Sequence, residues 1–437
     1  MPVRGLLVAV IVLGILAGGV YWSEQRQKAE DAKQASGGEA KLVHIQDEDV
    51  RKVELQVGET APLVLERDNS KQWQMKAPET WRVDQEAAGS VVSAYTGLSY
   101  DRVVEEKAAD LSSYGLQTPV IEATFTSGDG KSKKLQIGDE TPTGSGVFAK
   151  FEGEPRVFTL ASSAKSSLQK TANDLRDKRL LVFDPDKLSR LELTAKGASL
   201  EFGRNAQNQW QIVKPNPYRA DSVQVDELVR KLGDARMDTS APPQDAAFGS
   251  ASRVGAATLT GAGGVQSLEV RKKGEDYLAK SSAVPGVFKV GADLGEALNK
   301  SLDDFRNKKL FDFGFSDPSA ITFRSRDKTY AFQKAGENWS SGGKTMDPTS
   351  VQAFIDKVRD LSSIRFRDTG FLTADMDISV TSDSGKRVEK VQISKNGDSY
   401  FARREGEPAL YELDPKAVEE LQTAAGDVKE PPPPVKK

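Results

Sequence analysis

Six residues of chemically useful types recur in the same order along the chain. The tryptophans are Trp73, Trp210 and Trp339, and the aspartates that follow them are Asp84, Asp221 and Asp347. Exposed tryptophans could stack on sugar rings or other flat ligands, and aspartates could serve as catalytic carboxylates. Both have structural alternatives, because a tryptophan can fill a core and an aspartate can accept the free amide protons at a helix start. We expect core packing and capping.

Other reactive side chains are scarce. The chain has no cysteine and one histidine, His44, so thiolate nucleophiles, disulfides and zinc sites built from cysteine are excluded. Its 64 acidic residues show no spacing that selects a catalytic pair or a calcium loop. The 61 basic residues are interspersed with the acidic ones and leave a net charge of −3, without the basic stripe of a nucleic-acid binder. We therefore expect no catalytic residue, cofactor, metal or nucleic-acid partner.

The recurring residues belong to a longer internal repeat. The sequence AKFEGEPRVFTL at 149–160 returns as ARREGEPALYEL at 402–413, and a diverged copy, AKSSAVPGVFKV, lies at 279–290. The period is roughly 130 residues, which is the size of a small domain. The chain therefore consists of three copies of one unit, which favours a scaffold or binding role over a single catalytic centre.

Each copy repeats the same predicted elements. Alternating apolar residues predict antiparallel strands that end at the tryptophan, and an amphipathic helix begins after each aspartate. Apolar residues such as Val225, Leu228 and Leu232 give that helix one apolar face. Further β-hairpins follow, and a closing helix ends each copy. We expect an α+β fold of three tandem copies behind one N-terminal transmembrane helix.

The N-terminus predicts a membrane anchor. Residues 5–22 carry no charge, and a helix of this length is about 27 Å long, close to the thickness of a bilayer core. Arg4 precedes the span, and Tyr21 and Trp22 stand where interfacial aromatic residues gather. A cleavable signal peptide is the alternative, with small residues at 17–19. We expect an uncleaved anchor with the bulk of the chain on the outer side.

These patterns divide the chain into six parts. They are a transmembrane signal anchor at 1–22, a polar stalk at 23–41, repeat units at 42–183, 184–313 and 314–428, and a proline-rich tail at 429–437.

Three sequence segments resemble the bacterial family described as domain of unknown function 4340. They are KQWQMKAPETWRVD at 71–84, SSYGLQTP at 112–119 and LQIGDETPTGSGVFAKFEG at 135–153. The resemblance implies a membrane-anchored extracytoplasmic protein, in some cases accompanying ABC-type transport systems similar to those of gliding motility. It implies no catalytic residues.

Together, the patterns and the resemblance lead us to expect a non-enzymatic repeat protein on the bacterial cytoplasmic membrane, with its bulk periplasmic or extracytoplasmic. It would contact membrane lipid through its N-terminal helix and bind protein partners as an accessory or scaffold of a transport or envelope assembly. An envelope module that binds carbohydrate or lipid is the alternative, and an envelope enzyme is the third hypothesis.

The topology is directly testable. A reporter that is active only outside the cytoplasm, fused after Lys437, should be active, because the anchor would export the chain that follows it. The protein should also stay with the membranes during a carbonate wash. Activity confined to a cytoplasmic reporter would contradict the exported orientation, and release by the wash would favour signal cleavage.

Overall fold

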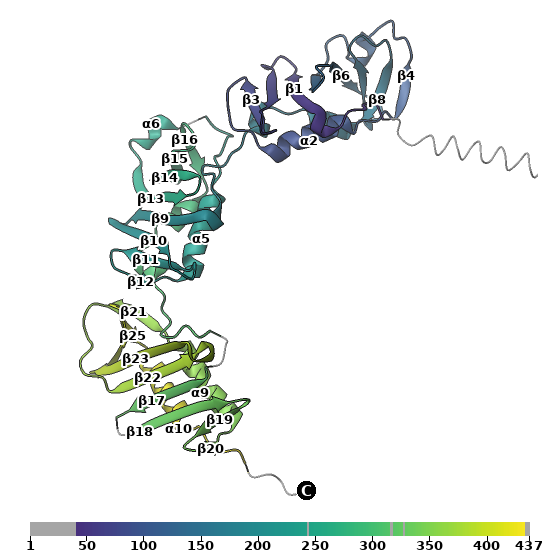
Figure 1. The fold of residues 1–437 in the computed structure, drawn as a ribbon. Helices are drawn as coiled ribbons and strands as arrows, with labels where there is room; N and C mark the ends of the chain where they lie inside the picture. The colour runs from purple at the N-terminus through teal and green to yellow at the C-terminus, as the bar shows by residue number, and fades with distance from the viewer. Residues whose placement is uncertain (1–40, 243, 315–317, 327, 433–437) are drawn as a thin grey trace, which may run out of the picture. The chain divides into compact units, whose positions relative to one another are not determined.

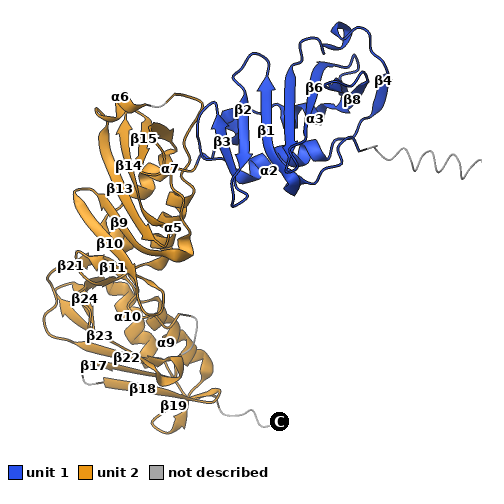
Figure 2. Cartoon of the chain, turned by 45° about the horizontal axis from the view of Figure 1, so that its top comes forward, with its two compact units in different colours: residues 1–178 blue, residues 179–437 orange. Residues whose placement is uncertain are grey.

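The computed structural model describes residues 41–432 except 243, 315–317 and 327. The chain forms two compact units, residues 1–178 and 179–437 (Figure 2). The predicted anchor at 5–22, with Arg4, Tyr21 and Trp22, lies outside the described residues. Among the helices that are described, none has the length and apolar character needed to cross a bilayer.

The first unit contains an eight-stranded sheet in the order β3-β2-β1-β5-β6-β7-β8-β4 (Figure 1). Its strands are β1 Val50–Val57, β2 Leu63–Arg67, β3 Trp73–Ala77, β4 Arg102–Glu105, β5 Ile121–Ser127, β6 Ser132–Glu140, β7 Gly146–Phe151 and β8 Val157–Ala161. Its helices are α2 Gln85–Thr96, α3 Ser162–Leu168 and α4 Ala172–Leu175, with 3-10 turns η1 Asp47–Asp49 and η2 Ser112–Tyr114.

The second unit begins with another eight-stranded sheet, in the order β12-β11-β10-β9-β13-β14-β15-β16. Its strands are β9 Leu188–Ala195, β10 Ala198–Arg204, β11 Trp210–Lys214, β12 Tyr218–Arg219, β13 Ser252–Gly261, β14 Gly264–Lys273, β15 Asp276–Ser281 and β16 Val287–Val290. The accompanying helices are η3 Pro185–Lys187, α5 Ser222–Gly233, α6 Asp245–Phe248, α7 Ala292–Leu298 and α8 Leu302–Phe305.

A nine-stranded sheet completes the second unit, in the order β20-β19-β18-β17-β22-β23-β24-β25-β21. Its strands are β17 Ala320–Ser325, β18 Lys328–Ala335, β19 Asn338–Ser341, β20 Lys344–Thr345, β21 Ser363–Arg367, β22 Met376–Ser382, β23 Arg387–Asn396, β24 Ser399–Arg404 and β25 Leu410–Leu413. Its helices are α9 Pro348–Asp360, η4 Asp383–Gly385 and α10 Pro415–Gly426.

The three sheets share one topology. The run β3-β2-β1-β5-β6-β7-β8 corresponds strand for strand to β11-β10-β9-β13-β14-β15-β16 and to β19-β18-β17-β22-β23-β24-β25. Neighbouring strands are antiparallel in each sheet, for example β1 with β5, β9 with β13 and β17 with β22. The chain is therefore an α+β protein in which one sheet pattern occurs three times. We refer to the portions carrying the three sheets as the first, second and third repeats.

Each main helix begins at one of the recurring aspartates. The carboxylate of Asp84 accepts hydrogen bonds from the amides of Glu86 and Ala87 at the start of α2. Asp221 accepts from Val223 and Gln224 at the start of α5, and Asp347 accepts from Ser350 in α9. These bonds satisfy amide protons that have no partner within the helix, so the three aspartates have a structural role as N-caps.

The apolar face of each helix packs on one face of its sheet and leaves the other face open. In the third repeat, Phe354 and Val358 of α9 share a buried core with Ile321 and Ile378 of the sheet. The other two repeats have corresponding cores of their own. Strand side chains alternate between the two faces, so one face of each sheet is apolar and covered by its main helix while the other carries most of the polar side chains. In the second repeat, part of that other face is covered as well, because Phe248 of α6 packs with Leu278 and Val287.

The recurring tryptophans lie in these cores. Trp73 and Trp210 are each 3% exposed, and Trp339 is 4% exposed. Each stands opposite a basic residue on the neighbouring strand whose charged group lies over the indole ring. These partners are Arg67 for Trp73, Arg204 for Trp210 and Lys334 for Trp339. The tryptophans are therefore packing residues, and a cation lies over one face of each indole ring.

The closing helix differs from the single helix expected in every copy. In the first two repeats it is split into two short helices, α3 and α4 or α7 and α8, whereas α10 is continuous. Thr171 and Ser301 start the second short helices with capping boxes, to Asp174 and Asp304 respectively, which restart the hydrogen-bond pattern.

The repeat boundaries also differ from the predicted ones at 183/184 and 313/314. Leu180 and Leu181 lie in the core of the second repeat, and Leu310 and Phe311 lie in that of the third. The amide of Leu180 donates to the carbonyl of Ala235, and that of Leu310 to the carbonyl of Leu361, just beyond the main helix of the following repeat. These backbone bonds assign each connecting segment to the repeat that it enters, and the second compact unit accordingly starts at residue 179.

The capping role of Asp221 predicts a specific pattern of stability. Asp221→Ala should lower the free energy of unfolding by about 1 kcal/mol, and Asp221→Asn by less, because an amide oxygen still accepts the bonds. Chemical denaturation of the two variants measures the difference. Loss of binding function in Asp221→Asn with unchanged unfolding would show that the carboxylate has another role.

The burial of Trp210 predicts a larger effect. Trp210→Ala should lower the free energy of unfolding by about 3–5 kcal/mol, because it empties a closely packed site. Trp210→Phe should retain most of that stability while losing the indole hydrogen bond to Asp226, which is 2.8 Å long. Thermal and denaturant unfolding test both variants, and a Trp210→Ala protein as stable as the wild type would contradict the core assignment.

Candidate functional site

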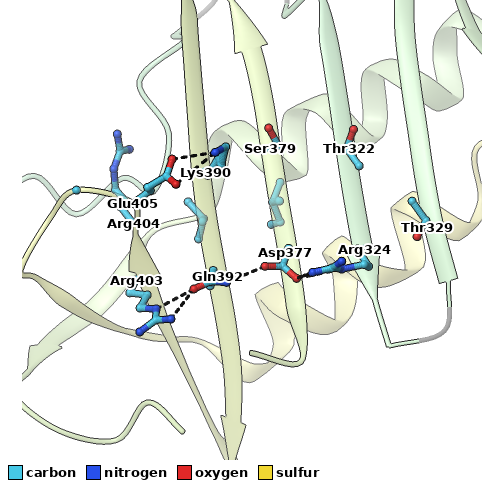
Figure 3. Close-up of a pocket in the computed structure, with 13 residues that line it drawn as sticks. Thr322, Arg324, Thr329, Asp377, Ser379, Lys390, Gln392, Arg403, Arg404 and Glu405 are labelled. Carbon is cyan, nitrogen blue, oxygen red and sulfur yellow. Dashed lines mark hydrogen bonds and ion pairs between the residues drawn. The ribbon is translucent and has the colours of Figure 1, made fainter. Parts of the chain in front are cut away.

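The open face of the third sheet carries a polar hollow of about 600 Å³. The side chains that line it come from β18, β17, β22, β23 and β24, which are neighbours in the sheet. Figure 3 shows this face with the helices behind the sheet. The polar residues that line the hollow are Thr322, Arg324, Thr329, Asp377, Ser379, Lys390, Gln392, Arg403, Arg404 and Glu405. Strand alternation directs most of these side chains away from the core covered by α9 and α10. Arg404 is the exception, because it follows the buried positions Tyr400 and Ala402 on β24 and reaches the hollow from its edge.

Four of these residues form a hydrogen-bonded row across the strands (Figure 3). Arg324 donates from Nε to Oδ2 of Asp377 at 3.1 Å, and Gln392 donates from Nε2 to Oδ1 of the same carboxylate at 2.9 Å. Arg403 donates from Nε and Nη2 to Oε1 of Gln392 at 2.9 and 2.7 Å. Because an ionised carboxylate can only accept, Asp377 fixes the Gln392 amide with its oxygen toward Arg403. We call these four residues the polar row.

The electrostatics of the row keep Asp377 charged. Burial raises the pKa of its carboxyl group, but hydrogen bonds from Gln392 and Arg324 outweigh that effect, so the pKa lies below its usual value. An aspartate held in the ionised state is a poor proton donor at neutral pH. The row is suited to binding and orienting charged groups.

Arg403 is the member of the row with spare binding capacity. Its guanidinium group lies 4.4 Å from the centre of the Phe371 ring and donates to the neutral Gln392 oxygen. Within the described part of the chain it forms no ion pair with a carboxylate, whereas Arg324 pairs with Asp377 and Lys390 with Glu405. The open face therefore presents an oriented cation that has no counter-ion among the residues that the structure describes.

Related residues occupy the same register in the other two sheets. In the first sheet Gln136 donates to Glu122 at 2.9 Å and stands opposite Lys150. In the second sheet Glu269 stands opposite Lys280, as Gln392 stands opposite Arg403 in the third. A polar residue facing a basic one at this position is thus a feature of all three repeats.

The residues singled out from the sequence do not form this site. The three tryptophans are buried in separate cores, and the three aspartates cap separate helices. The exposed aromatic platform that was the alternative for the tryptophans is therefore contradicted by their burial. Among the described residues, no group of three or more His, Cys, Asp and Glu side chains is placed to hold a metal ion.

The polar row escaped sequence reasoning because its members are distant along the chain. Arg324, Asp377, Gln392 and Arg403 lie on β17, β22, β23 and β24, and only the strand register brings them together. A usable signal was present in the alternation of ISVT and VQIS, where every second residue is polar. That pattern identifies an open face without identifying cross-strand partners.

The SSYGLQTP segment has a structural role in the first repeat. It forms η2, and a Cβ atom at Gly138 of β6 would lie 2.1 Å from the carbonyl oxygen of Tyr114. The Tyr114 ring packs edge-on against that of Phe148, with the ring centres 5.0 Å apart, and its hydroxyl donates to Glu105 at 3.0 Å. The glycine therefore allows this loop to lie directly against the sheet.

Comparisons with solved structures add no functional information. One match is the DNA polymerase III subunit beta from Pseudomonas aeruginosa, with 9% identity over 87% of this chain and 95% of that chain, and a TM-score of 0.15. A TM-score this low carries no argument about fold or function. No curated protein matches the chain.

The family comparison is informative. The profile described as Domain of unknown function (DUF4340) matches residues 73–251 and again residues 210–377. The first match contains Trp73, Asp84 and the SSYGLQTP segment, and the second begins at Trp210. The two matches together span more than half of the chain, and the chain belongs to the DUF4340 family.

Proposed function

We propose that this protein is a non-enzymatic binding scaffold, tethered to the bacterial cytoplasmic membrane by residues 5–22. Its repeats would lie on the outer side and serve a transport or envelope assembly. The third sheet would bind a partner protein through its open face. The transport setting follows from the resemblance described above, and the site follows from the geometry of the open face.

The observation that carries the proposal is Arg403 in the polar row. Its two hydrogen bonds to Gln392 and its position over Phe371 orient the guanidinium group before any partner arrives. A group that is already ordered loses less side-chain entropy on binding. Arginine is also over-represented among the residues that dominate protein interfaces.

The charge of Arg403 selects the chemistry of the partner. A guanidinium group binds a carboxylate through two parallel hydrogen bonds, and the free edge of Arg403 has no such partner in the described chain. We therefore assign the open face to a protein segment bearing aspartate or glutamate. Thr322, Thr329 and Ser379 lie farther across the same face, on β17, β18 and β22, and would supply hydrogen bonds to other parts of the bound segment.

The buried tryptophans favour this proposal over a carbohydrate-binding module. Trp73, Trp210 and Trp339 are at most 4% exposed, so none can offer a ring face to a sugar. The polar hollow instead has paired charges and small hydroxyl side chains on a broad sheet surface. Such a surface suits protein contacts better than it suits sugar stacking.

Site-specific photo-crosslinking in native membranes tests the proposal. A photoreactive residue at Thr329, on the open face, should yield a defined protein adduct. One at Lys416, whose side chain is 81% exposed on α10, should not.

Arg403→Ala should weaken binding of that partner about tenfold, or ~1.4 kcal/mol, because an oriented charged contact is lost. The matched control is Arg230→Ala, which removes an exposed arginine paired with Glu227 and Asp234 on α5.

Three outcomes would contradict the proposal. Equal adduct yields from Thr329 and Lys416 would show that the open face is not the binding surface. Adducts to lipid or polysaccharide alone would move the assignment to the carbohydrate- or lipid-binding alternative. Unchanged partner binding in Arg403→Ala would remove the residue on which the proposal rests.

A further inference from the structure

A second arginine is surrounded by acceptors from several parts of the chain. Arg219, on β12 of the second repeat, donates from Nη1 to both carboxylate oxygens of Asp312 at 2.7 and 2.8 Å. Its Nη2 donates to the hydroxyl of Tyr411 at 3.2 Å and to the carbonyl of Lys309. Its Nε lies 2.7 Å from Oε1 of Glu407 as an ion pair, without hydrogen-bond geometry. We call these four acceptors the arginine socket.

The socket belongs to the third repeat and to the segment that enters it. Glu407 lies in the turn between β24 and β25, Tyr411 lies on β25, and Asp312 lies between two residues of the third core, Phe311 and Phe313. The side chains of Arg219 and Glu407 are only 19% and 15% exposed. Solvent therefore screens this contact less than it screens the surface ion pairs elsewhere in the chain.

Tyr411 of the socket and the nearby Arg404 are replaced by other residue types at the corresponding positions of the other two repeats. The internal repeat aligns Tyr411 with Phe158 and Phe288, and Arg404 with Phe151 and Ser281. In the first repeat Phe151 and Phe158 pack together as part of the core, with their ring centres 5.9 Å apart. In the third repeat, Arg404 stands in place of Phe151, and Tyr411 keeps an aromatic ring in the core but adds a hydroxyl group.

Arg404 shows how the socket is held in place. It donates from Nη1 to the carbonyl of Leu310 and from Nη2 to Glu389 at 3.1 Å, and its Nε lies 2.8 Å from Glu407. In the second repeat Ser281 donates to the corresponding carbonyl of Leu180. Arg404 therefore takes over the anchoring of the connecting segment and also orders the carboxylates that receive Arg219.

An independent contact lies close to the socket. The guanidinium group of Arg306 lies 4.2 Å from the ring centre of Tyr218 in the second repeat and 3.5 Å from that of Phe366 in the third. Tyr218 packs against both the second and the third cores. Tyr218, whose ring contacts Arg306, and Arg219, which enters the socket, are therefore adjacent residues of β12.

We propose that the third repeat contains a guanidinium-binding socket, and that seating of Arg219 in this socket locks the second and third repeats into one rigid body. Arginine suits this task because its planar group can satisfy several acceptors at once, which a lysine ammonium group cannot do in the same geometry. The inference concerns the mechanics of the chain and does not depend on the partner proposed for the open face.

The experiment uses the full-length chain, in which the absence of cysteine allows two spin labels to be placed without other substitutions. Labels at Glu275→Cys and Lys416→Cys report the distance between the second and third repeats. The unaltered socket should give one narrow distance distribution. Arg219→Ala should at least double its width, Arg219→Lys should give an intermediate width, and Arg230→Ala should leave it unchanged.

A second variant and two further measurements guard against a variant that simply unfolds. Glu407→Gln weakens the socket from the other side and should broaden the same distribution. Tryptic cleavage after Lys308 or Lys309 should become at least about tenfold faster in both socket variants, because cleavage follows local opening of the segment. Circular dichroism that matches the wild type would show that the repeats remain folded.

Chemical rescue tests recognition of the guanidinium group itself. The socket borders a hollow of about 640 Å³, so a small cation can enter after truncation of Arg219. Methylguanidinium should narrow the distribution of Arg219→Ala, whereas methylammonium should not. Distributions in Arg219→Ala and Glu407→Gln that match that of Arg230→Ala would overturn the inference. Arg403→Ala should not change the distribution, so this inference and the binding proposal fail separately.

Discussion

The capping aspartates supply the contact on which each repeat depends, because each one joins the start of the main helix to the end of its repeat. The amide of Asp84 donates to the carbonyl of Leu175, that of Asp221 to Phe305, and that of Asp347 to Lys429. Meanwhile each carboxylate caps its helix. One residue type thus fixes where the helix begins and where the chain leaves the repeat, and the apolar helix face is held over one side of the sheet.

Covering one face of an antiparallel sheet leaves the other face to carry polar side chains. On the third sheet these side chains are organised by their cross-strand register, in which Asp377 orients Gln392 and Gln392 orients Arg403. The same constraint places Gln136 opposite Lys150 in the first sheet. The candidate binding face is therefore a consequence of the packing that forms the core, and its specificity depends on which polar residues each repeat places on the same scaffold.

The third repeat shows how a buried position can change from packing to polar recognition. Tyr411 remains 1% exposed where the first repeat has Phe158, and burial raises the pKa of its hydroxyl group to about 12. Its ring still packs against that of Phe366, with the ring centres 5.4 Å apart, while its hydroxyl donates to Glu407 at 2.7 Å. The aromatic ring thus keeps its place in the core, and the added oxygen is satisfied by hydrogen bonds, which avoids the penalty of an unpaired buried polar group.

The sequence by itself determined the features that depend on local periodicity and internal repetition. Alternating residues predicted the strands, aspartates before apolar stripes predicted the capped helices, and the segments at 71–84, 112–119 and 135–153 indicated the family. Only the tertiary structure decided which polar residues meet, because Arg324 and Arg403, or Arg219 and Glu407, are joined by strand pairing and chain crossing rather than by proximity in sequence. It also decided the boundaries, since Leu180 and Leu310 are assigned by backbone bonds to residues that follow much later. Local propensity acts over a few residues, whereas these contacts depend on how whole sheets are assembled.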